Sequence, residues 1–177
     1  MVTSCTGSAP AAIVVMGPAG SGKSLVGARL AAALGWPFYE GDAFHPPANV
    51  ERMHRGEPLS DANRAPWLAA LAATIARCVA GGTPAVLSCS ALRRAYREAL
   101  VPAGAPAGAV AFVYLRADRG LLAARLAARS GHFFPPALLA SQLAALEPPA
   151  ADEPVLTLDA ARPPDELVTA VRRALCI

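Results

Sequence analysis

The chain has 177 residues, of which 54% are hydrophobic and only 16% charged, so it can build one continuous core and does not have the composition of a disordered protein. A formal net charge of +3 without any dense basic run argues against a nucleic-acid groove, and suits small anionic ligands. The most apolar segment after the first strand, residues 67–76, is stopped by Arg77 and is too short to cross a bilayer. Neither nucleic acid nor a membrane is therefore expected as a partner.

Short β-branched apolar runs alternate with helical patterns from one end of the chain to the other. Residues 1–12 are expected to form a flexible N-terminal tail, and residues 13–177 a single domain. In chain order, the expected elements are a strand at 11–16, a helix at 24–34, a strand at 37–40, a short helix near 50–55, a helix at 67–79, a strand at 83–89, a helix at 91–100, a strand at 110–115, helices at 119–129 and 137–146, a strand at 155–158 and a helix at 164–175. This alternation predicts an α/β fold, with a five-stranded parallel sheet between two layers of helices.

The turn between the first strand and the first helix carries the clearest motif. Residues 17–24 read GPAGSGKS and match the phosphate-binding pattern G-x-x-x-x-G-K-[ST]. In such a loop the backbone N–H groups point at phosphate oxygens, the lysine reaches the β- and γ-phosphates and the hydroxyl binds Mg²⁺. Lys23 is the only lysine among sixteen basic residues, which indicates a position that a guanidinium does not fit. The expected ATP-binding residues are Gly17, Pro18, Ala19, Gly20, Ser21, Gly22, Lys23 and Ser24, with Ser24 also the expected metal ligand.

Other classes of phosphate-binding-loop protein are excluded by motifs that the chain lacks. With a single lysine there is no N-K-x-D guanine motif, and there is no LSGGQ-like signature of a transport ATPase. The third strand ends in Ser88, Cys89 and Ser90, where such ATPases carry an acidic residue. A small kinase that transfers a γ-phosphoryl group to a metabolite remains.

A polar segment, GDAFHPPANVERM, follows the second strand at residues 41–53. Ligands of open α/β sheets bind beyond the carboxyl ends of the strands, so Asp42 is expected to face the γ-phosphate from the acceptor side. There it can hold the attacking hydroxyl, accept its proton or position Mg²⁺ through water; the alternative is a turn-capping role. His45 is expected either to bind the acceptor or to fix the loop. Arg64, Arg93 and Arg94 are candidates to clamp an anionic acceptor, or else are solvated surface side chains.

Four segments together resemble the gluconate kinases, small relatives of the shikimate and adenylate kinases. They are GPAGSGKS, GDAFHPPANVERMHRGEPLSDANRAPWL, SCSALRRAYRE and RLAARSGHFF, and they cover most of the chain from Ile13. The resemblance implies ATP- and Mg²⁺-dependent phosphorylation of D-gluconate on its terminal hydroxyl, giving 6-phospho-D-gluconate. It also implies a nucleoside- and shikimate-kinase-like three-layer fold with a mobile lid, and a homodimer.

The resemblance also implies roles for particular residues. Residues 45–66 match the acceptor-binding segment and residues 130–140 the lid. Arg125 and Arg129 share a helix face and match arginines that pack on adenine or reach the phosphates, although an exposed helix face is the alternative. Arg129 would thus join Lys23 and Asp42 as a catalytic residue, and His132 would contact the acceptor.

One departure from the family pattern and two rival functions remain. Family members often mix lysine and arginine where this chain has Arg93 and Arg94, which leaves affinity for gluconate less certain than the reaction class. The rivals are a kinase for another acceptor, such as shikimate or a nucleoside monophosphate, and a nucleotide-binding regulatory module. Cys5, Cys78, Cys89 and Cys176 are widely spaced without a C-x-x-C pair, which favours reduced thiols and a cytoplasmic location.

Overall fold

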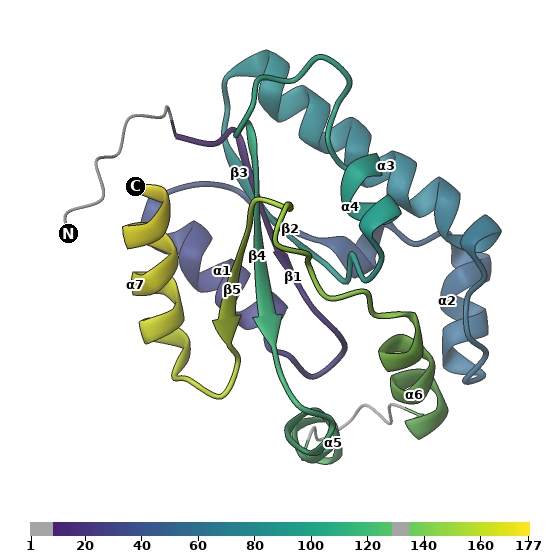
Figure 1. Ribbon diagram of the computed structural model, residues 1–177. Helices are drawn as coiled ribbons and strands as arrows, with labels where there is room; N and C mark the ends of the chain where they lie inside the picture. The colour runs from purple at the N-terminus through teal and green to yellow at the C-terminus, as the bar shows by residue number, and fades with distance from the viewer. Residues whose placement is uncertain (1–8, 129–134) are drawn as a thin grey trace.

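The computed structural model describes residues 9–128 and 135–177, and in them five parallel strands form one sheet with helices on both faces (Figure 1). The strands are β1 (Ala12–Met16), β2 (Phe38–Glu40), β3 (Ala85–Cys89), β4 (Val110–Arg116) and β5 (Val155–Asp159), in the spatial order β2-β3-β1-β4-β5. The helices are α1 (Lys23–Leu34), the 3₁₀ turn η1 (Gly41–Phe44), α2 (Pro47–His54), α3 (Asp61–Gly81), α4 (Arg94–Ala99), α5 (Arg119–Ala127), α6 (Pro136–Ala145) and α7 (Pro164–Leu175). The predicted five-stranded parallel α/β sheet is confirmed.

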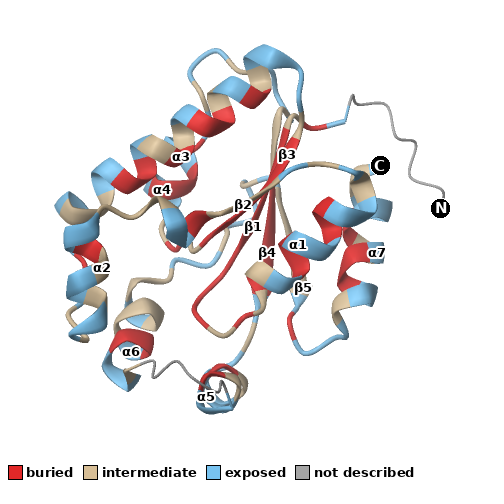
Figure 2. Cartoon of the chain, turned by 180° about the vertical axis from the view of Figure 1, so that it is seen from behind, coloured by how far each residue is buried: buried red, intermediate tan, exposed pale blue. Residues whose placement is uncertain are grey.

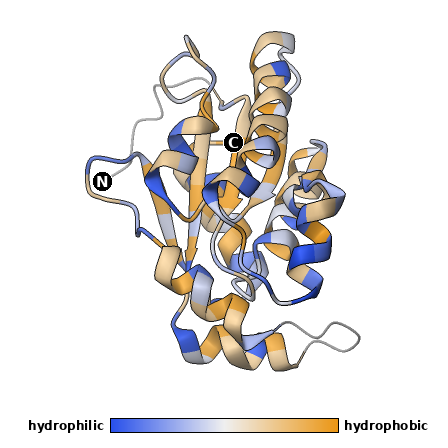
Figure 3. Cartoon of the chain, turned by 90° about the vertical axis from the view of Figure 1, so that its right-hand side faces the viewer, coloured by the Kyte–Doolittle hydropathy of each residue, from blue (hydrophilic) through white to orange (hydrophobic). Residues whose placement is uncertain are grey.

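The central strand β1 is buried on both sides, which is why its sequence is apolar throughout (Figure 2). Val14 and Met16 belong to the core cluster that α3 and α4 cover, where Trp67 is among the largest buried side chains. Ile13 and Val15 belong to the opposite cluster, which α1 and α7 cover. Figure 3 shows the same arrangement by hydropathy, with hydrophobic strands between helices whose outer surfaces carry hydrophilic residues. The loop that leaves β1 therefore starts from the centre of the molecule.

Two helix starts differ from the prediction. The helix expected from residue 67 begins at Asp61, because Ser60 and Asn63 form a capping box: the Ser60 hydroxyl accepts from the Asn63 N–H, and the Asn63 side chain accepts from the Ser60 N–H. Pro66 lies inside this helix. The helix expected from residue 91 begins at Arg94, because Ala91 has a φ of +43°, outside the right-handed helical region.

The polar segment after β2 is more ordered than its sequence suggests. It contains η1 and the eight-residue helix α2, where a single short helix near residues 50–55 was expected. Cys78 and Cys89 are buried free thiols, as expected for these two positions. No helix in the described ranges is both long and apolar enough to cross a bilayer.

Candidate active site

A cavity of about 670 Å³ opens at the carboxyl ends of the strands. Its walls come from the loop after β1, from η1 after β2, from Ser90 after β3 and from Ala160 after β5, with further residues from α2, α3, α5 and α6. Parallel strands end at one edge of the sheet, so residues distant in sequence meet there. This volume is in the range of sites that bind a small molecule.

The loop of residues 17–22 has the conformation that its glycines permit. Gly20 has a φ of +84°, and a Cβ there would lie 2.9 Å from the carbonyl oxygen of Leu122. The loop thus packs closely on α5, and Ala19 joins Leu122, Leu126 and Leu139 in a small apolar cluster. The Ser21 hydroxyl is buried and has no hydrogen-bond partner among the described residues. A tightly wound loop with an unsatisfied hydroxyl is suited to hold an anion.

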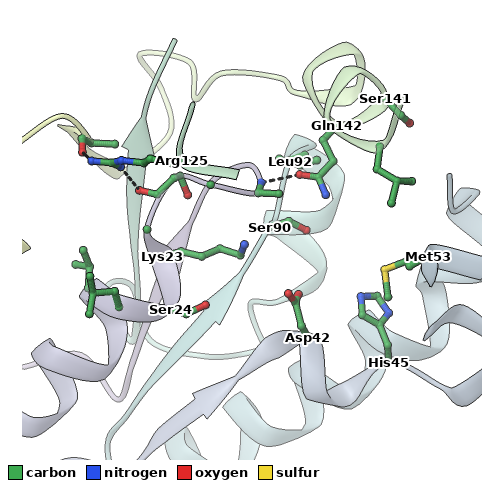
Figure 4. Close-up of a pocket in the computed structure, with 18 of the residues that line it drawn as sticks. Lys23, Ser24, Asp42, His45, Met53, Ser90, Leu92, Arg125, Ser141 and Gln142 are labelled. Atoms are coloured by element: carbon green, nitrogen blue, oxygen red, sulfur yellow. Dashed lines mark hydrogen bonds between the residues drawn. The ribbon is translucent and has the colours of Figure 1, made fainter. Parts of the chain in front are cut away.

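The positive end of α1 is left open at this loop. Gly22, its N-cap residue, provides no side-chain bond, and the first turn contains no acidic residue. Lys23 is 8% exposed and forms no ion pair with any described residue, and its ammonium group points into the cavity (Figure 4). A buried cation at an uncapped helix N-terminus favours a bound phosphate. The residues present therefore fit the phosphates of ATP.

Asp42 faces Lys23 and Ser24 across the cavity (Figure 4). It is held through its neighbour Gly41, whose N–H donates to the Ser88 hydroxyl at 3.0 Å and whose carbonyl accepts from Trp67 Nε1 at 2.7 Å. The Ser88 hydroxyl in turn donates to the Glu40 carboxylate. No residue with a side chain fits at Gly41, because a Cβ there would lie 2.0 Å from the Ser88 carbonyl oxygen.

The oxygen ligands here suit Mg²⁺ rather than a metal that needs a dense protein cage. The described residues contain no cluster of three or more His, Cys, Asp or Glu side chains. Mg²⁺ usually keeps several waters and binds through one or two protein groups together with substrate phosphates. The Ser24 hydroxyl and the Asp42 carboxylate, which line the same cavity, provide such a set.

His45 lines the cavity and stacks on Trp67, with the ring centroids 4.4 Å apart and the planes 12° apart. Asn49 Nδ2 lies 3.4 Å from His45 Nδ1. Burial lowers the pKa of His45 below its ordinary value, and the opposing effect of Asp42 is smaller. At neutral pH the imidazole is therefore uncharged and can both donate and accept a hydrogen bond. Trp67 is 1% exposed and supports this ring.

Of the three arginines predicted to clamp an acceptor, only Arg64 lines the cavity. Its Nη1 lies 3.3 Å from the Tyr96 hydroxyl and 3.6 Å from Asp61 Oδ1. Arg93 is bound to the same Asp61 at 2.6 Å, outside the cavity lining. The Tyr96 hydroxyl and, to a lesser degree, the two arginines lower the pKa of Asp61, so this carboxylate is ionised at neutral pH.

Arg94 takes part in a different network. It pairs with Glu98 at 2.9 Å and with Asp152 at 3.0 Å, and its N–H donates to the Glu147 carboxylate. Arg94 is absent from the cavity lining, so the structure gives its predicted contact with the acceptor no support.

Arg125 lies at the opposite end of the cavity and ties two of its walls together (Figure 4). Its guanidinium donates to the Ala160 carbonyl at 2.8 Å and to the Ser21 carbonyl at 3.4 Å. The segment after β5 also borders the cavity, through Ala160 and Arg162. The predicted contacts of Arg129 and His132 lie outside the described residues.

Two features of the site were missed from the sequence. The pair Glu40–Ser88, which braces Gly41, joins positions 48 residues apart. Gln142 of α6 accepts a hydrogen bond from the Ala19 N–H at 2.7 Å, across 123 residues. No short motif marks either pair, because each depends on strands and helices that meet only in the folded chain.

A family model, several relatives and several solved structures are similar to this chain. A family model described as AAA domain matches residues 13–149. A gluconokinase of Gluconobacter oxydans is 51% identical over 156 residues, covering 88% of this chain and 86% of the relative. A thermoresistant gluconokinase of Escherichia coli is 40% identical over 156 residues, covering 88% and 87%. The crystal structure of a gluconokinase from Sinorhizobium meliloti superposes with a TM-score of 0.80 at 47% identity, covering 94% of this chain and 90% of the other. A shikimate kinase from Aquifex aeolicus, at 15% identity and a TM-score of 0.62, shares the fold.

Proposed function

Since the chain belongs to the gluconokinase family, we propose that it transfers the γ-phosphoryl group of ATP to the terminal hydroxyl of D-gluconate, giving 6-phospho-D-gluconate and ADP. One observation supports this most directly. An ammonium at the end of the loop after β1 and a carboxylate on the turn after β2 face each other across a single cavity. Such a pair suits a reaction in which a phosphoryl group moves from an anion-binding loop toward a hydroxyl.

The donor half of the reaction belongs to the loop after β1. Its backbone N–H groups and Lys23 hold the phosphates, and Lys23 stabilises the charge that develops on the transferred group and on the ADP oxygen. The Ser24 hydroxyl, with Asp42 on the opposite wall, would hold Mg²⁺. When bound, this ion would neutralise part of the charge on the phosphates. Arg125 lies where it can pack against the adenosine part of ATP.

The acceptor half belongs to η1, α2 and α3. Asp42 orients the terminal hydroxyl of gluconate and accepts its proton, while the bond between the γ-phosphorus and the β-γ bridging oxygen breaks and a new bond to the hydroxyl oxygen forms. Arg64 binds the carboxylate of gluconate, since a guanidinium matches a carboxylate through two parallel hydrogen bonds. The uncharged ring of His45 contacts a hydroxyl of the sugar chain.

A coupled assay of ADP release tests the proposal. Purified protein with ATP and Mg²⁺ is offered D-gluconate, shikimate and nucleoside monophosphates in parallel. We expect ADP release that requires gluconate, with a kcat/KM for gluconate at least 100-fold above that for the other acceptors. Faster release with another acid would reassign the acceptor. ATP binding without ADP release on any acceptor would favour the regulatory-module alternative.

We further propose, from the resemblance to the gluconate kinases, that the protein is a cytoplasmic homodimer whose residues 130–140 form a lid and whose residues 13–177 form one kinase domain. Light scattering on the eluting protein would test the dimer. A mass of one chain, 18.1 kDa, across a wide range of loading concentration would contradict it. Closure of the lid over ATP would exclude water and suppress wasteful hydrolysis.

A further inference from the structure

The side chain of Gln142 connects α6 directly to the phosphate loop. Its Oε1 accepts a hydrogen bond from the Ala19 N–H at 2.7 Å, and the residue lines the cavity (Figure 4). Leu139, one turn earlier on α6, packs with Ala19 in the same apolar cluster. The approach of Gln142 to the loop is therefore held by packing as well as by the hydrogen bond.

The bond to Ala19 determines which way the amide of Gln142 faces. A backbone N–H only donates, so the atom that meets it must be the carbonyl oxygen of the side chain. The other terminal atom of the side-chain amide is then the nitrogen Nε2, which carries two N–H donors. Nε2 has no hydrogen-bond partner in the described part of the chain, and in Figure 4 it lies on the side of Gln142 that faces Ser90 and the interior of the cavity.

We propose that Gln142 Nε2 donates a hydrogen bond to an oxygen of the transferred γ-phosphoryl group; this inference rests on the proposed function. The phosphoryl group must pass between Lys23 and Asp42, and Gln142 lines that part of the cavity from the side opposite α1. A donor fixed in advance and aimed at developing negative charge stabilises a transition state without reorganisation. Ala19 thus acts on the phosphate indirectly, by orienting the amide that touches it.

A purely structural role makes a different prediction from a contact with the γ-phosphoryl group. If Gln142 only braced the loop, its loss would weaken the binding of ADP and of ATP equally, because the loop holds the α- and β-phosphates that both nucleotides carry. If Nε2 contacts the γ-phosphoryl group, its loss weakens the binding of ATP and leaves the binding of ADP unchanged. The ratio of ATP affinity to ADP affinity separates the two roles, and it requires neither gluconate nor turnover.

Two substitutions test this ratio. Gln142→Met is similar in size and removes both acceptor and donor, whereas Gln142→Glu keeps an oxygen for the Ala19 N–H and replaces the donor with an acceptor. We expect both variants to reduce the ratio of affinities, measured by calorimetry with ADP and with a non-hydrolysable ATP analogue, by about 10- to 100-fold, the range for a hydrogen bond to a charged group. The kcat with gluconate should fall by a similar factor. Ala144→Gln, at an exposed position of the same helix, is the control and should change none of these values by more than about twofold.

Each outcome decides the proposal. An unchanged ratio in Gln142→Met, or wild-type ATP affinity and kcat in Gln142→Glu, would overturn it and leave Gln142 as a brace of the loop. If Gln142→Met fails to fold, judged by circular dichroism, Gln142→Glu decides alone, because it preserves the bond to Ala19. Failure of the wild-type protein to phosphorylate gluconate would instead refute the proposed acceptor, while the binding ratio would still report on Gln142.

Discussion

Removing the charge of Glu153 should lower the free energy of unfolding of the protein, and the size of this decrease should depend on pH. Glu153 binds the guanidinium of Arg97 through two hydrogen bonds, of 2.6 and 2.7 Å, and the side chains of the two residues are only 10% and 3% exposed. Arg97 also donates to the carbonyl groups of Ala91, Leu92 and Glu147. The pair therefore fixes the turn after β3, from which Leu92 enters the cavity lining.

The size of the effect follows from the acidity of Glu153. Its hydrogen bonds with Arg97 lower the pKa of the carboxyl from 4.5 to about 2. This difference of about 2.5 pH units, at about 1.36 kcal/mol each, corresponds to about 3 kcal/mol of stability. Because the folded-state pKa is the lower one, the contribution is complete above about pH 4.5 and disappears as the pH falls toward 2. Glu153→Gln leaves the buried Arg97 charge without a counter-ion, a change that costs about 3–5 kcal/mol in other proteins.

Urea denaturation of the wild-type protein and of Glu153→Gln at pH 7, 5 and 3 provides the assay. We expect the free energy of unfolding of the variant to be about 3 kcal/mol lower than that of the wild type at pH 7. This is equivalent to a decrease in Tm of about 6–12 °C for a chain of this size. The difference between the two proteins should shrink at pH 3. Glu98→Gln, which breaks the exposed pair with Arg94, is the control and should cost less than about 0.5 kcal/mol. A loss below 0.5 kcal/mol in Glu153→Gln, or a difference that does not change with pH, would refute the reasoning.

Four further substitutions test the proposed site. Lys23→Arg should reduce kcat by about 10²-fold or more with an unchanged circular dichroism spectrum, because the forked guanidinium does not fit among the loop N–H groups; activity like the wild type would show this explanation to be wrong. Asp42→Asn should lower kcat by about 10²- to 10⁴-fold while ATP binding, measured by calorimetry, stays intact; a kcat within about threefold of the wild type would make Asp42 a turn residue. Arg64→Ala should raise KM for gluconate by about 10-fold or more and leave KM for ATP nearly unchanged, and equal increases in both would argue for a structural role. Gly41→Ala should cost more than about 3 kcal/mol in urea denaturation, since its Cβ would lie 2.0 Å from the Ser88 carbonyl oxygen; wild-type stability would contradict this geometry.

Local sequence patterns were sufficient to predict the sheet and the phosphate loop. The apolar run at β1, the glycines of residues 17–22 and the helical spacing of α1 are each encoded within about twenty residues, so their physical causes can be read directly. The position of Asp42 followed as well, because parallel strands place their carboxyl ends at one edge. Arg64, one of the three arginines predicted to clamp an acceptor, lines the cavity, and its contact with an acceptor stays a prediction.

The remaining features depend on contacts between distant segments. Gln142 meets Ala19 across 123 residues, and Arg97 meets Glu153 across 56 residues. No periodic pattern encodes such pairs. The start of α3 has a local cause that the prediction overlooked: the capping box of Ser60 and Asn63 begins the helix at Asp61, before the predicted start at residue 67.

The two sides of the cavity are attached to parts of the sheet that differ in how firmly they are held. β1 pairs along five residues with a neighbour on each side, whereas β2 is an edge strand of three partly buried residues that, within residues 9–128 and 135–177, pairs with β3 alone. Local opening requires least free energy where backbone pairing and apolar burial are scarce, so we expect β2 to open more readily than β1. The proposed nucleotide side of the cavity thus rests on a more firmly paired strand than the proposed acceptor side, and amide hydrogens should exchange with solvent sooner in β2 than in β1.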